Sequence, residues 1–217
     1  MDNSVLLSGD EVQDFETLMF LYSSAIKEIN TKIDILRDEF QFRHHYNPIE
    51  HVTSRLKSPQ SIVKKLQRGG HETDLLSMQR YLNDIAGVRI VCSFTSDIYK
   101  IADMISGQDD IKVLLIKNYI ASPKANGYKS YHMIVTVPIF TSSGPVDTKV
   151  EIQIRTIAMD FWASLEHKMY YKFEGDAPEY IKEELKECAK MINALDDRML
   201  LLNEAILSLS GKPEDSE

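Results

Sequence analysis

Two long helical patterns of apolar residues flank the chain. From about Glu11 to Phe40, apolar residues recur every three or four positions, which predicts one long amphipathic helix or two collinear ones. From Ile181 to Leu209, spacings of four and three residues alternate, as in the seam of a heptad repeat. This second helix is expected to pack either against the N-terminal helix of the same chain or against another subunit.

The segment between them predicts shorter elements. Ser58 followed by Pro59 is an N-cap with proline at the first helical position, and a Gly69-Gly70 pair ends that helix. Helices that alternate with strands predict an α+β fold, in which a mixed sheet is flanked by helices. Strand-like segments are 85–94, 131–138 and 150–155, with a further candidate at 112–117, a turn at 141–145, and helices near 97–106 and 158–171.

The segment 150–155, VEIQIR, alternates three apolar residues with Glu151, Gln153 and Arg155. In an extended strand these three polar side chains lie on one face. A solvent-facing strand is the simpler interpretation, because such a strand accepts almost any polar residue. A binding face is the alternative, and the rest of the chain has to decide between them.

Composition narrows the possible functions. The chain has 217 residues, 43% of them hydrophobic, enough for one domain with appendages. A net charge of -8 argues against a general binder of nucleic acids or anionic membranes, so a phosphate site must be a local basic cluster. Cys92 and Cys188 have neither metal-site nor disulfide spacing, which is typical of core residues in a reducing compartment. No apolar run reaches the ~20 residues of a membrane span, so we expect a soluble cytoplasmic protein.

One such basic cluster lies at 55–68, which contains no acidic residue. Taken alone, such a run is more often the solvated face of a surface helix, but the free N–H groups of a helix that begins after Ser58 add weight to a phosphate site. Its cations are Arg55, Lys57, Lys64, Lys65 and Arg68.

Two carboxylates and one loop complete the candidate chemistry. Asp84 precedes the strand at 85–94 and suits either a turn cap or, together with Glu151, a Mg²⁺ ion that also binds phosphates. The loop 122–130, SPKANGYKS, is either an ordinary surface turn or a set of phosphate and base contacts. Its candidates are Lys124, Tyr128 and Lys129, followed by His132. The motifs of P-loop kinases, dinucleotide-binding dehydrogenases and serine hydrolases do not occur in the sequence.

Four segments in this order resemble the synthetase domain of the RelA/SpoT-type (p)ppGpp synthetases: NPIEHVTSRLKSPQSI, NDIAGVRIVC, NGYKSYH and VEIQIRTIAMDFWASLEHK. The resemblance covers roughly residues 45–172. It implies a nucleotidyltransferase-like mixed sheet in a single domain over 1–217, with terminal helices at about 11–40 and 178–209. The length is similar to that of a small alarmone synthetase, and two segments, LMFLYSSAIKEINTKI and IRTIAMDFWASLEHK, look closer to the RelP-like than to the RelQ-like branch.

The resemblance implies that the β,γ-pyrophosphate of ATP moves to the ribose 3′-hydroxyl of GDP or GTP, with release of AMP and Mg²⁺ as cofactor. Asp84 and Glu151 would bind Mg²⁺, and Glu151 would also take the proton of the hydroxyl. The implied ATP-binding residues are Arg55, Lys57, Ser61, Lys65, Arg68 and Arg89. The implied residues for GDP or GTP are Lys124, Tyr128, Lys129, His132, Gln153 and Arg155.

The resemblance also bears on assembly and regulation. It implies a homotetramer formed through the terminal helices, and synthesis without hydrolysis, because the histidine-aspartate motif of the hydrolase domain is missing. The RelQ-like branch has an asparagine at Asp160 within its activator site, so activation by pppGpp is not expected here. Two other hypotheses remain: a nucleotide- or RNA-binding regulatory module without turnover, and a purely structural oligomer.

Overall fold

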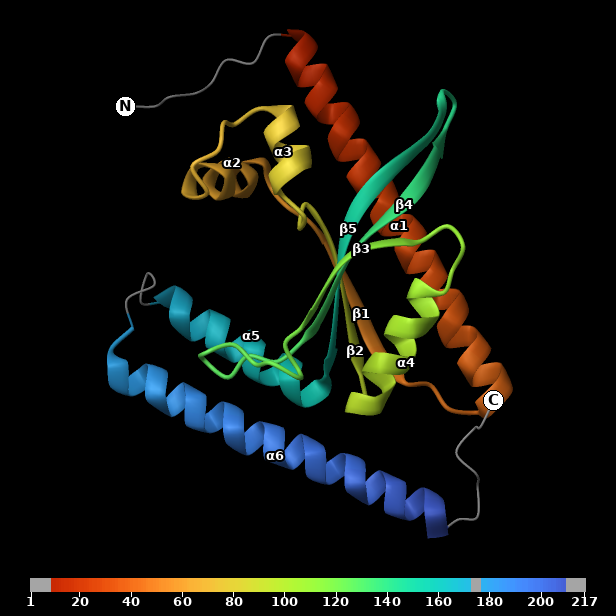
Figure 1. Ribbon diagram of the computed structural model, residues 1–217, viewed down its shortest axis with the longest axis vertical. Coiled ribbons are helices and arrows are strands. Elements are labelled where there is room, and N and C mark those ends of the chain that lie inside the picture. The colour runs from red at the N-terminus through yellow and green to blue at the C-terminus, as the bar shows by residue number, and fades with distance from the viewer. Residues whose placement is uncertain (1–8, 173–176, 210–217) are drawn as a thin grey trace.

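The computed structural model describes residues 9–172 and 177–209, which form one sheet surrounded by helices (Figure 1). The helices are α1 (Gly9–His44), α2 (Pro59–Arg68), α3 (Leu75–Tyr81), α4 (Thr95–Ser106), α5 (Ile157–Lys172) and α6 (Glu179–Leu209). The strands are β1 (Ile49–Leu56), β2 (Ala86–Cys92), β3 (Lys112–Asn118), β4 (Tyr131–Thr141) and β5 (Gly144–Thr156).

The sheet is mixed, as predicted, with the strand order β1-β2-β5-β4-β3. The central pair, β2 and β5, is parallel, and the other neighbouring pairs are antiparallel. A two-residue turn joins β4 to β5, and Gly144 takes a φ of 115°, a region that favours glycine. The register places Gln153 of β5 between Arg89 of β2 and His132 of β4, so side chains far apart in the sequence lie in one row.

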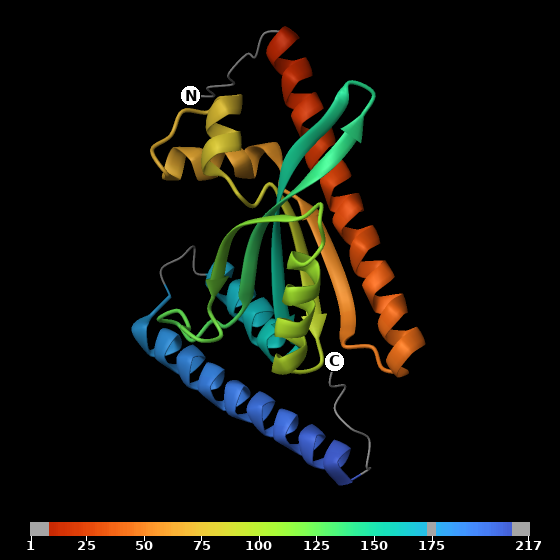
Figure 2. The same ribbon diagram turned by 45° about the vertical axis from the view of Figure 1, so that its right-hand side comes forward.

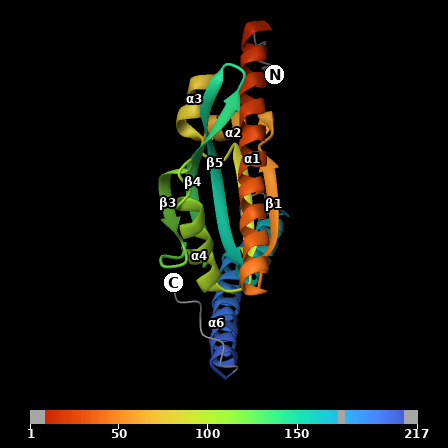
Figure 3. The same ribbon diagram turned by 90° about the vertical axis from the view of Figure 1, so that its right-hand side faces the viewer.

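One face of the sheet forms the main core with α1 and α4. The predicted alternation sends the apolar residues of β2 and β5 to this face, where both helices cover them. Figure 3 shows α1 running the length of the sheet, and Figure 2 shows α4 against the sheet. Fully buried residues of this core include Ile29 and Ile33 of α1, Ile98 and Ile101 of α4, and Ile90, Ile152 and Ile154 of the sheet.

Helix α6 packs on α5, not on α1 as one interpretation of its heptad seam had predicted. Its first half is held by buried Leu185 and Ala189, and Nε1 of Trp162 donates to the Leu185 carbonyl at 2.9 Å. The second half leaves the seam exposed. The exposed fractions are 59% for Leu195, 50% for Met199, 52% for Leu202 and 63% for Ile206. The intrachain alternative therefore does not explain the whole seam.

Two elements were not predicted, β1 and α3. Only Ile49 of β1 is fully buried, so this edge strand lacks the apolar alternation of the central strands. Helix α3 has seven residues and depends on a cap, because Oδ1 of Asp74 accepts from the Ser77 N–H at 2.7 Å. The predicted start of α2 is confirmed: the Ser58 hydroxyl accepts from the Ser61 N–H at 3.3 Å.

Both cysteines are free thiols, as expected; Cys92 is buried and Cys188 half-buried. In the part of the chain that the structure describes, no helix is both long and apolar enough to span a membrane.

Replacing Ile101 by alanine should destabilise the protein by about 2–5 kcal/mol, because the cavity opens in the main core. Its helix neighbour Lys100 is exposed, and Lys100→Ala should change stability by less than about 0.5 kcal/mol. Urea unfolding followed by circular dichroism measures both. Equal midpoints for the two variants would contradict the assignment of Ile101 to the core.

Candidate active site

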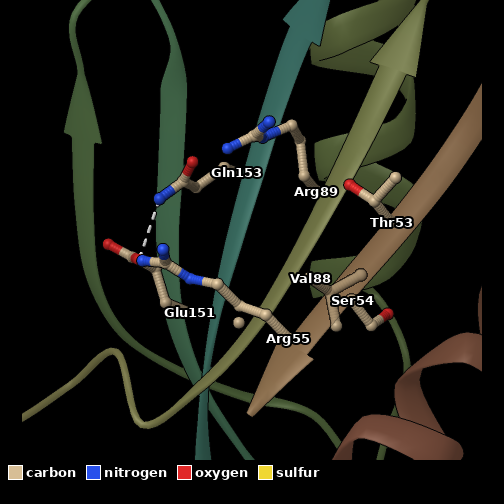
Figure 4. A pocket seen from close by; sticks show the side chains of 8 residues that line it. Thr53, Ser54, Arg55, Val88, Arg89, Glu151 and Gln153 are labelled. Atoms are coloured by element: carbon tan, nitrogen blue, oxygen red, sulfur yellow. Dashed lines mark hydrogen bonds between the residues drawn. The ribbon is translucent and has the colours of Figure 1, made fainter. Parts of the chain in front are cut away.

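A pocket opens on the polar face of the sheet, opposite α1 and α4 (Figure 4). Its volume is about 180 Å³, and β1, β2 and β5 supply its walls. Gly87 pairs with Arg55 on one side and with Glu151 on the other, and the Arg55 side chain lies over it. The pocket is lined by Thr53, Ser54, Arg55, Gly87, Val88, Arg89, Glu151 and Gln153.

Asp84, directly before β2, is a buried carboxylate shared by two lysines. The ammonium nitrogens of Lys57 and Lys65 both lie 2.7 Å from Oδ2. Burial alone would raise the pKa of Asp84, but the hydrogen bonds and charges of the two lysines outweigh it and hold that pKa below its usual value. The other oxygen, Oδ1, is buried and has no hydrogen-bond partner among the described residues. Asp84 is therefore ionised, with one oxygen left to bind a ligand.

Glu151, on β5, is also held in its ionised form. Nδ1 of His132 lies 3.4 Å from Oε1, and Nε2 of Gln153 donates to Oε2 at 2.9 Å. Burial and the negative charge of Asp84 act to raise the pKa of Glu151, but His132 and Gln153 outweigh them and lower it. The influence of Asp84 on this group places both carboxylates in one region of the site.

The two carboxylates fit a hard divalent cation. Mg²⁺ binds oxygen ligands and is usually held by one or two carboxylates together with substrate phosphates and water. The orphaned Oδ1 of Asp84 is a ligand of this kind. Within residues 9–172 and 177–209, no three His, Cys, Asp or Glu side chains gather around a common point, so the remaining ligands would have to come from a substrate.

Arg155 answers the question raised by the polar face of β5. Only 4% of the residue is exposed, so it does not face solvent. Its guanidinium donates to the Tyr128 hydroxyl at 2.5 Å, to Oε1 of Gln153 at 3.0 Å and to Oδ1 of Asp160 at 3.1 Å. The same Oδ1 lies 3.3 Å from a guanidinium nitrogen of Arg89. Asp160, in the first turn of α5, thus pairs with arginines of both central strands.

A second pocket, of about 310 Å³, lies between this arginine cluster and α5. Tyr128 stands at its edge, and the Tyr128 hydroxyl lies 2.9 Å from Nε2 of His132. The ammonium of Lys124 lies 4.8 Å from the Tyr128 ring centre. The lining residues are Arg55, Arg89, Tyr128, Arg155, Ala163, Ser164, Glu166, His167 and Lys168, so both pockets share Arg55 and Arg89.

The loop that carries Tyr128 rests on α6. Gly127 has a φ of 88°, and a Cβ there would lie 2.6 Å from the Cβ of Ala189, so no larger residue fits. Tyr128 also packs on the cluster formed by Trp162, Ala163 and Ala189. The position of the second pocket's aromatic wall thus depends on the C-terminal helix.

The predicted site residues fall into three groups. Eight line the two pockets or contact a residue that does: Arg55, Arg89, Lys124, Tyr128, His132, Glu151, Gln153 and Arg155. Lys57, Lys65 and Asp84 form an ion-paired cluster of their own and line neither pocket. Three others lie elsewhere: Ser61 accepts a hydrogen bond from the Ser58 hydroxyl, Arg68 is exposed in the last turn of α2, and the charge of Lys129 acts on Asp196 of α6.

Sequence reasoning did not identify Asp160, Ser130 and Glu166 as residues of this site. Asp160 is five positions after Arg155, across the end of a strand, so no helical or strand period connects the two. The Ser130 hydroxyl, in the loop directly before β4, accepts from Nε of Arg155 at 3.3 Å. Contacts of this kind carry no signal in the local sequence.

Comparison with known proteins agrees with the fold. A family model described as "Region found in RelA / SpoT proteins" matches residues 54–176. The GTP pyrophosphokinase YwaC of Bacillus subtilis is 44% identical over 95% of this chain and 100% of its own length. The structure of small alarmone synthetase 2 from Bacillus subtilis superposes with a TM-score of 0.81 at 43% identity, over 88% of this chain and 99% of that one.

The structure of small alarmone synthetase 1 from Bacillus subtilis, bound to its product pppGpp, has a TM-score of 0.82 at 36% identity over 89% of this chain and 98% of that one. The higher identity to synthetase 2 confirms the predicted RelP-like branch. The chain belongs to the RelA/SpoT family and, within it, to the small alarmone synthetases.

Proposed function

We propose that this protein is a GTP pyrophosphokinase, which transfers the β,γ-pyrophosphate of ATP to the ribose 3′-hydroxyl of GDP or GTP. The observation that carries the proposal is the pair of ionised carboxylates, Asp84 and Glu151, beside a pocket that Arg55 and Arg89 line. The name of YwaC and the pppGpp bound to small alarmone synthetase 1 support it. A module that only binds nucleotides has no need of this carboxylate pair.

In this mechanism ATP occupies the pocket between β1 and β2. Arg55 and Arg89 flank its base or ribose, and Lys57 and Lys65 meet its phosphates from their positions beside Asp84. We assign Ser61 and Arg68 to the same phosphates. Ser61 lies four residues before Lys65 and Arg68 three residues after it, so the three side chains share one face of the helix. Asp84 and Glu151 would hold Mg²⁺, which neutralises charge on the transferred group.

The reaction itself needs a base and an oriented acceptor. The 3′-oxygen of the acceptor attacks the β-phosphorus of ATP, the bond to the α-phosphate oxygen breaks, and AMP leaves. Glu151 is ionised and takes the proton that the hydroxyl loses. Since this transfer depends on positioning and charge neutralisation, a site of arginines, lysines and carboxylates is sufficient.

We assign the acceptor nucleotide to the second pocket. Tyr128 offers a ring on which a base stacks, and Lys124 and His132 lie around that ring. Gln153 and Arg155 lie between this ring and Glu151, where they orient the ribose and phosphates. Lys129 contributes charge from the far side of the loop. We further propose a single synthetase domain with a core at about 45–172 that makes (p)ppGpp and does not hydrolyse it, because the sequence lacks the hydrolase motif.

We also propose that the protein assembles as a homotetramer through its terminal helices. The exposed seam of α6 supports this, since five seam residues are at least 50% exposed: Leu195, Met199, Leu202, Ile206 and Leu209. Helix α1 exposes Phe20 and Ile35 in the same way, at 59% and 61%.

The activity is tested with γ-labelled ATP, Mg²⁺ and GDP or GTP, with the products separated by chromatography. Label should move to the guanine nucleotide with release of AMP, and chelation of Mg²⁺ should abolish it. Glu151→Gln should lower the rate by at least about 100-fold through loss of the base, whereas Glu183→Gln, on the exposed side of α6, should not. Tight nucleotide binding without transfer would favour a binding module; no thermal shift with nucleotide would favour a structural oligomer.

Asp160 is expected to position both nucleotide-binding arginines. Asp160→Ala should raise the KM values for ATP and for the acceptor together, by roughly 10-fold or more, because Arg89 and Arg155 lose a charged hydrogen-bond partner. Asp160→Asn keeps an acceptor oxygen and should raise the two KM values less than Asp160→Ala does. The matched control is Asp147→Asn at the exposed end of β5. An effect on only one of the two KM values would contradict a shared role.

The assembly is tested by light scattering after gel filtration. The wild type should have the mass of four chains, and the double variant Leu202→Glu, Ile206→Glu should form a smaller species, because two charges enter an apolar contact. Glu204→Gln, between them on an exposed position, should leave the mass unchanged. A monomeric wild type would rule the tetramer out.

A further inference from the structure

The second pocket contains one carboxylate that the proposed reaction does not use. Glu166, on α5, lines this pocket together with Tyr128 and Arg155. It is half-buried, and the charged residues that share the pocket with it are mainly cations: Arg55, Arg89, Arg155 and Lys168. A carboxylate here lowers the attraction for phosphates, so a role in phosphate binding does not explain it.

The position of Glu166 is tied to that of Tyr128 by a single amide. Nδ2 of Asn126 donates to Oε1 of Glu166 at 3.1 Å. Oδ1 of the same side chain accepts from the Tyr128 N–H at 3.2 Å, which fixes the orientation of the amide. Among the described residues, no hydrogen bond or ion pair engages Oε2 of Glu166. The structure thus holds an aromatic ring and an available carboxylate oxygen at opposite ends of one asparagine.

A base stacked on Tyr128 has a defined place to enter. Two cations lie near this ring: the ammonium of Lys124 at 4.8 Å and the guanidinium carbon of Arg155 at 5.0 Å from its centre. Arg155 is buried and held by four hydrogen bonds, whereas Lys124 is exposed. A base that stacks on this ring would displace the exposed Lys124 and not the buried Arg155, and Glu166 lines the same pocket as the ring.

Guanine matches a carboxylate at that edge. Its N1–H and N2–H₂ groups are adjacent donors, and a carboxylate accepts from both. Adenine presents an unprotonated N1 at the same position, whose lone pair a carboxylate repels. We infer that Glu166, held by Asn126, reads the donor edge of guanine and so determines which base the acceptor pocket takes. This inference rests on the proposed function.

The arginines that the two pockets share do not distinguish one nucleotide from another. The two pockets share Arg55 and Arg89, and cations of this kind bind the phosphates of any nucleotide. Phosphate contacts alone would let ATP occupy the acceptor pocket as well. A carboxylate that rejects adenine prevents this self-inhibition.

The test compares GDP, IDP and XDP as acceptors for the wild type, Glu166→Gln and the control Glu183→Gln. IDP lacks the N2 amine, and XDP has an oxygen in its place. The wild type should favour GDP over both by at least about tenfold in kcat/KM, because the missing donor leaves a carboxylate oxygen unpaired. Glu166→Gln should lower kcat/KM for GDP by at least about tenfold. It should raise the ratio of kcat/KM for XDP to that for GDP by a similar factor, since the glutamine amide donates to the xanthine oxygen. The KM for ATP should stay unchanged.

Equilibrium binding of the three acceptors, measured by calorimetry, separates this inference from the proposed function. Suppose that the wild type transfers no pyrophosphate yet binds GDP more tightly than IDP and XDP, with that preference lost in Glu166→Gln. The proposed reaction is then wrong, whereas the role of Glu166 in guanine recognition is supported. If transfer occurs and the acceptor ratios of Glu166→Gln equal those of the wild type, that role of Glu166 is wrong. Asn126→Ala provides a second variant, in which the preference for GDP should weaken without a change in the KM for ATP.

Discussion

Two carboxylates of the site, Asp84 and Asp160, are each shared between two cations, and the site depends on that ratio. Asp84 pairs with Lys57 and Lys65, and Asp160 pairs with Arg89 and Arg155. A buried charge without a partner is strongly destabilising, so the acids are needed to keep the cations in place. Two acids and four cations still leave positive charge over. A chain with a net charge of -8 thereby gains a local attraction for polyanionic substrates.

In the proposed mechanism, the same pairing brings the two nucleotides together. Arg89 lies on β2 and Arg155 on β5, and a single oxygen of Asp160 contacts both. The parallel register of these strands brings Arg89 beside Gln153 on the face opposite the core. The core face holds the strands rigidly through isoleucines from α1, α4 and the sheet. Rigid strands keep the polar groups at distances that a flexible loop would not maintain.

Helix α6 connects the acceptor pocket to the outer surface of the protein. Its inner side touches the loop of Tyr128 at Ala189, and Oδ2 of Asp196 accepts a hydrogen bond from the Thr156 hydroxyl at 2.6 Å, at the end of β5. Its outer side carries the exposed apolar seam. One helix therefore contacts the wall of the second pocket on one side and leaves an apolar seam exposed on the other.

Local patterns were sufficient where one physical rule acts on neighbouring residues. The alternation in segment 150–155 predicted a strand with an apolar and a polar face, and Ser58-Pro59 predicted the start of α2. The strand β1 was missed because an edge strand with one buried residue has no alternation to read. The heptad spacing at 181–209 predicted a helix and its seam but left its partner undecided.

The sequence by itself determined all elements except β1 and α3, the polar strand face, the ionisable candidates and, through four motifs, the family. Only the tertiary structure decided which of those groups meet. Asp160 lies between arginines of two strands, and Asn126 joins Tyr128 to Glu166, forty residues further along the chain. The reason is physical: period and propensity act over a few residues, whereas pairing between distant charges depends on strand register and helix packing.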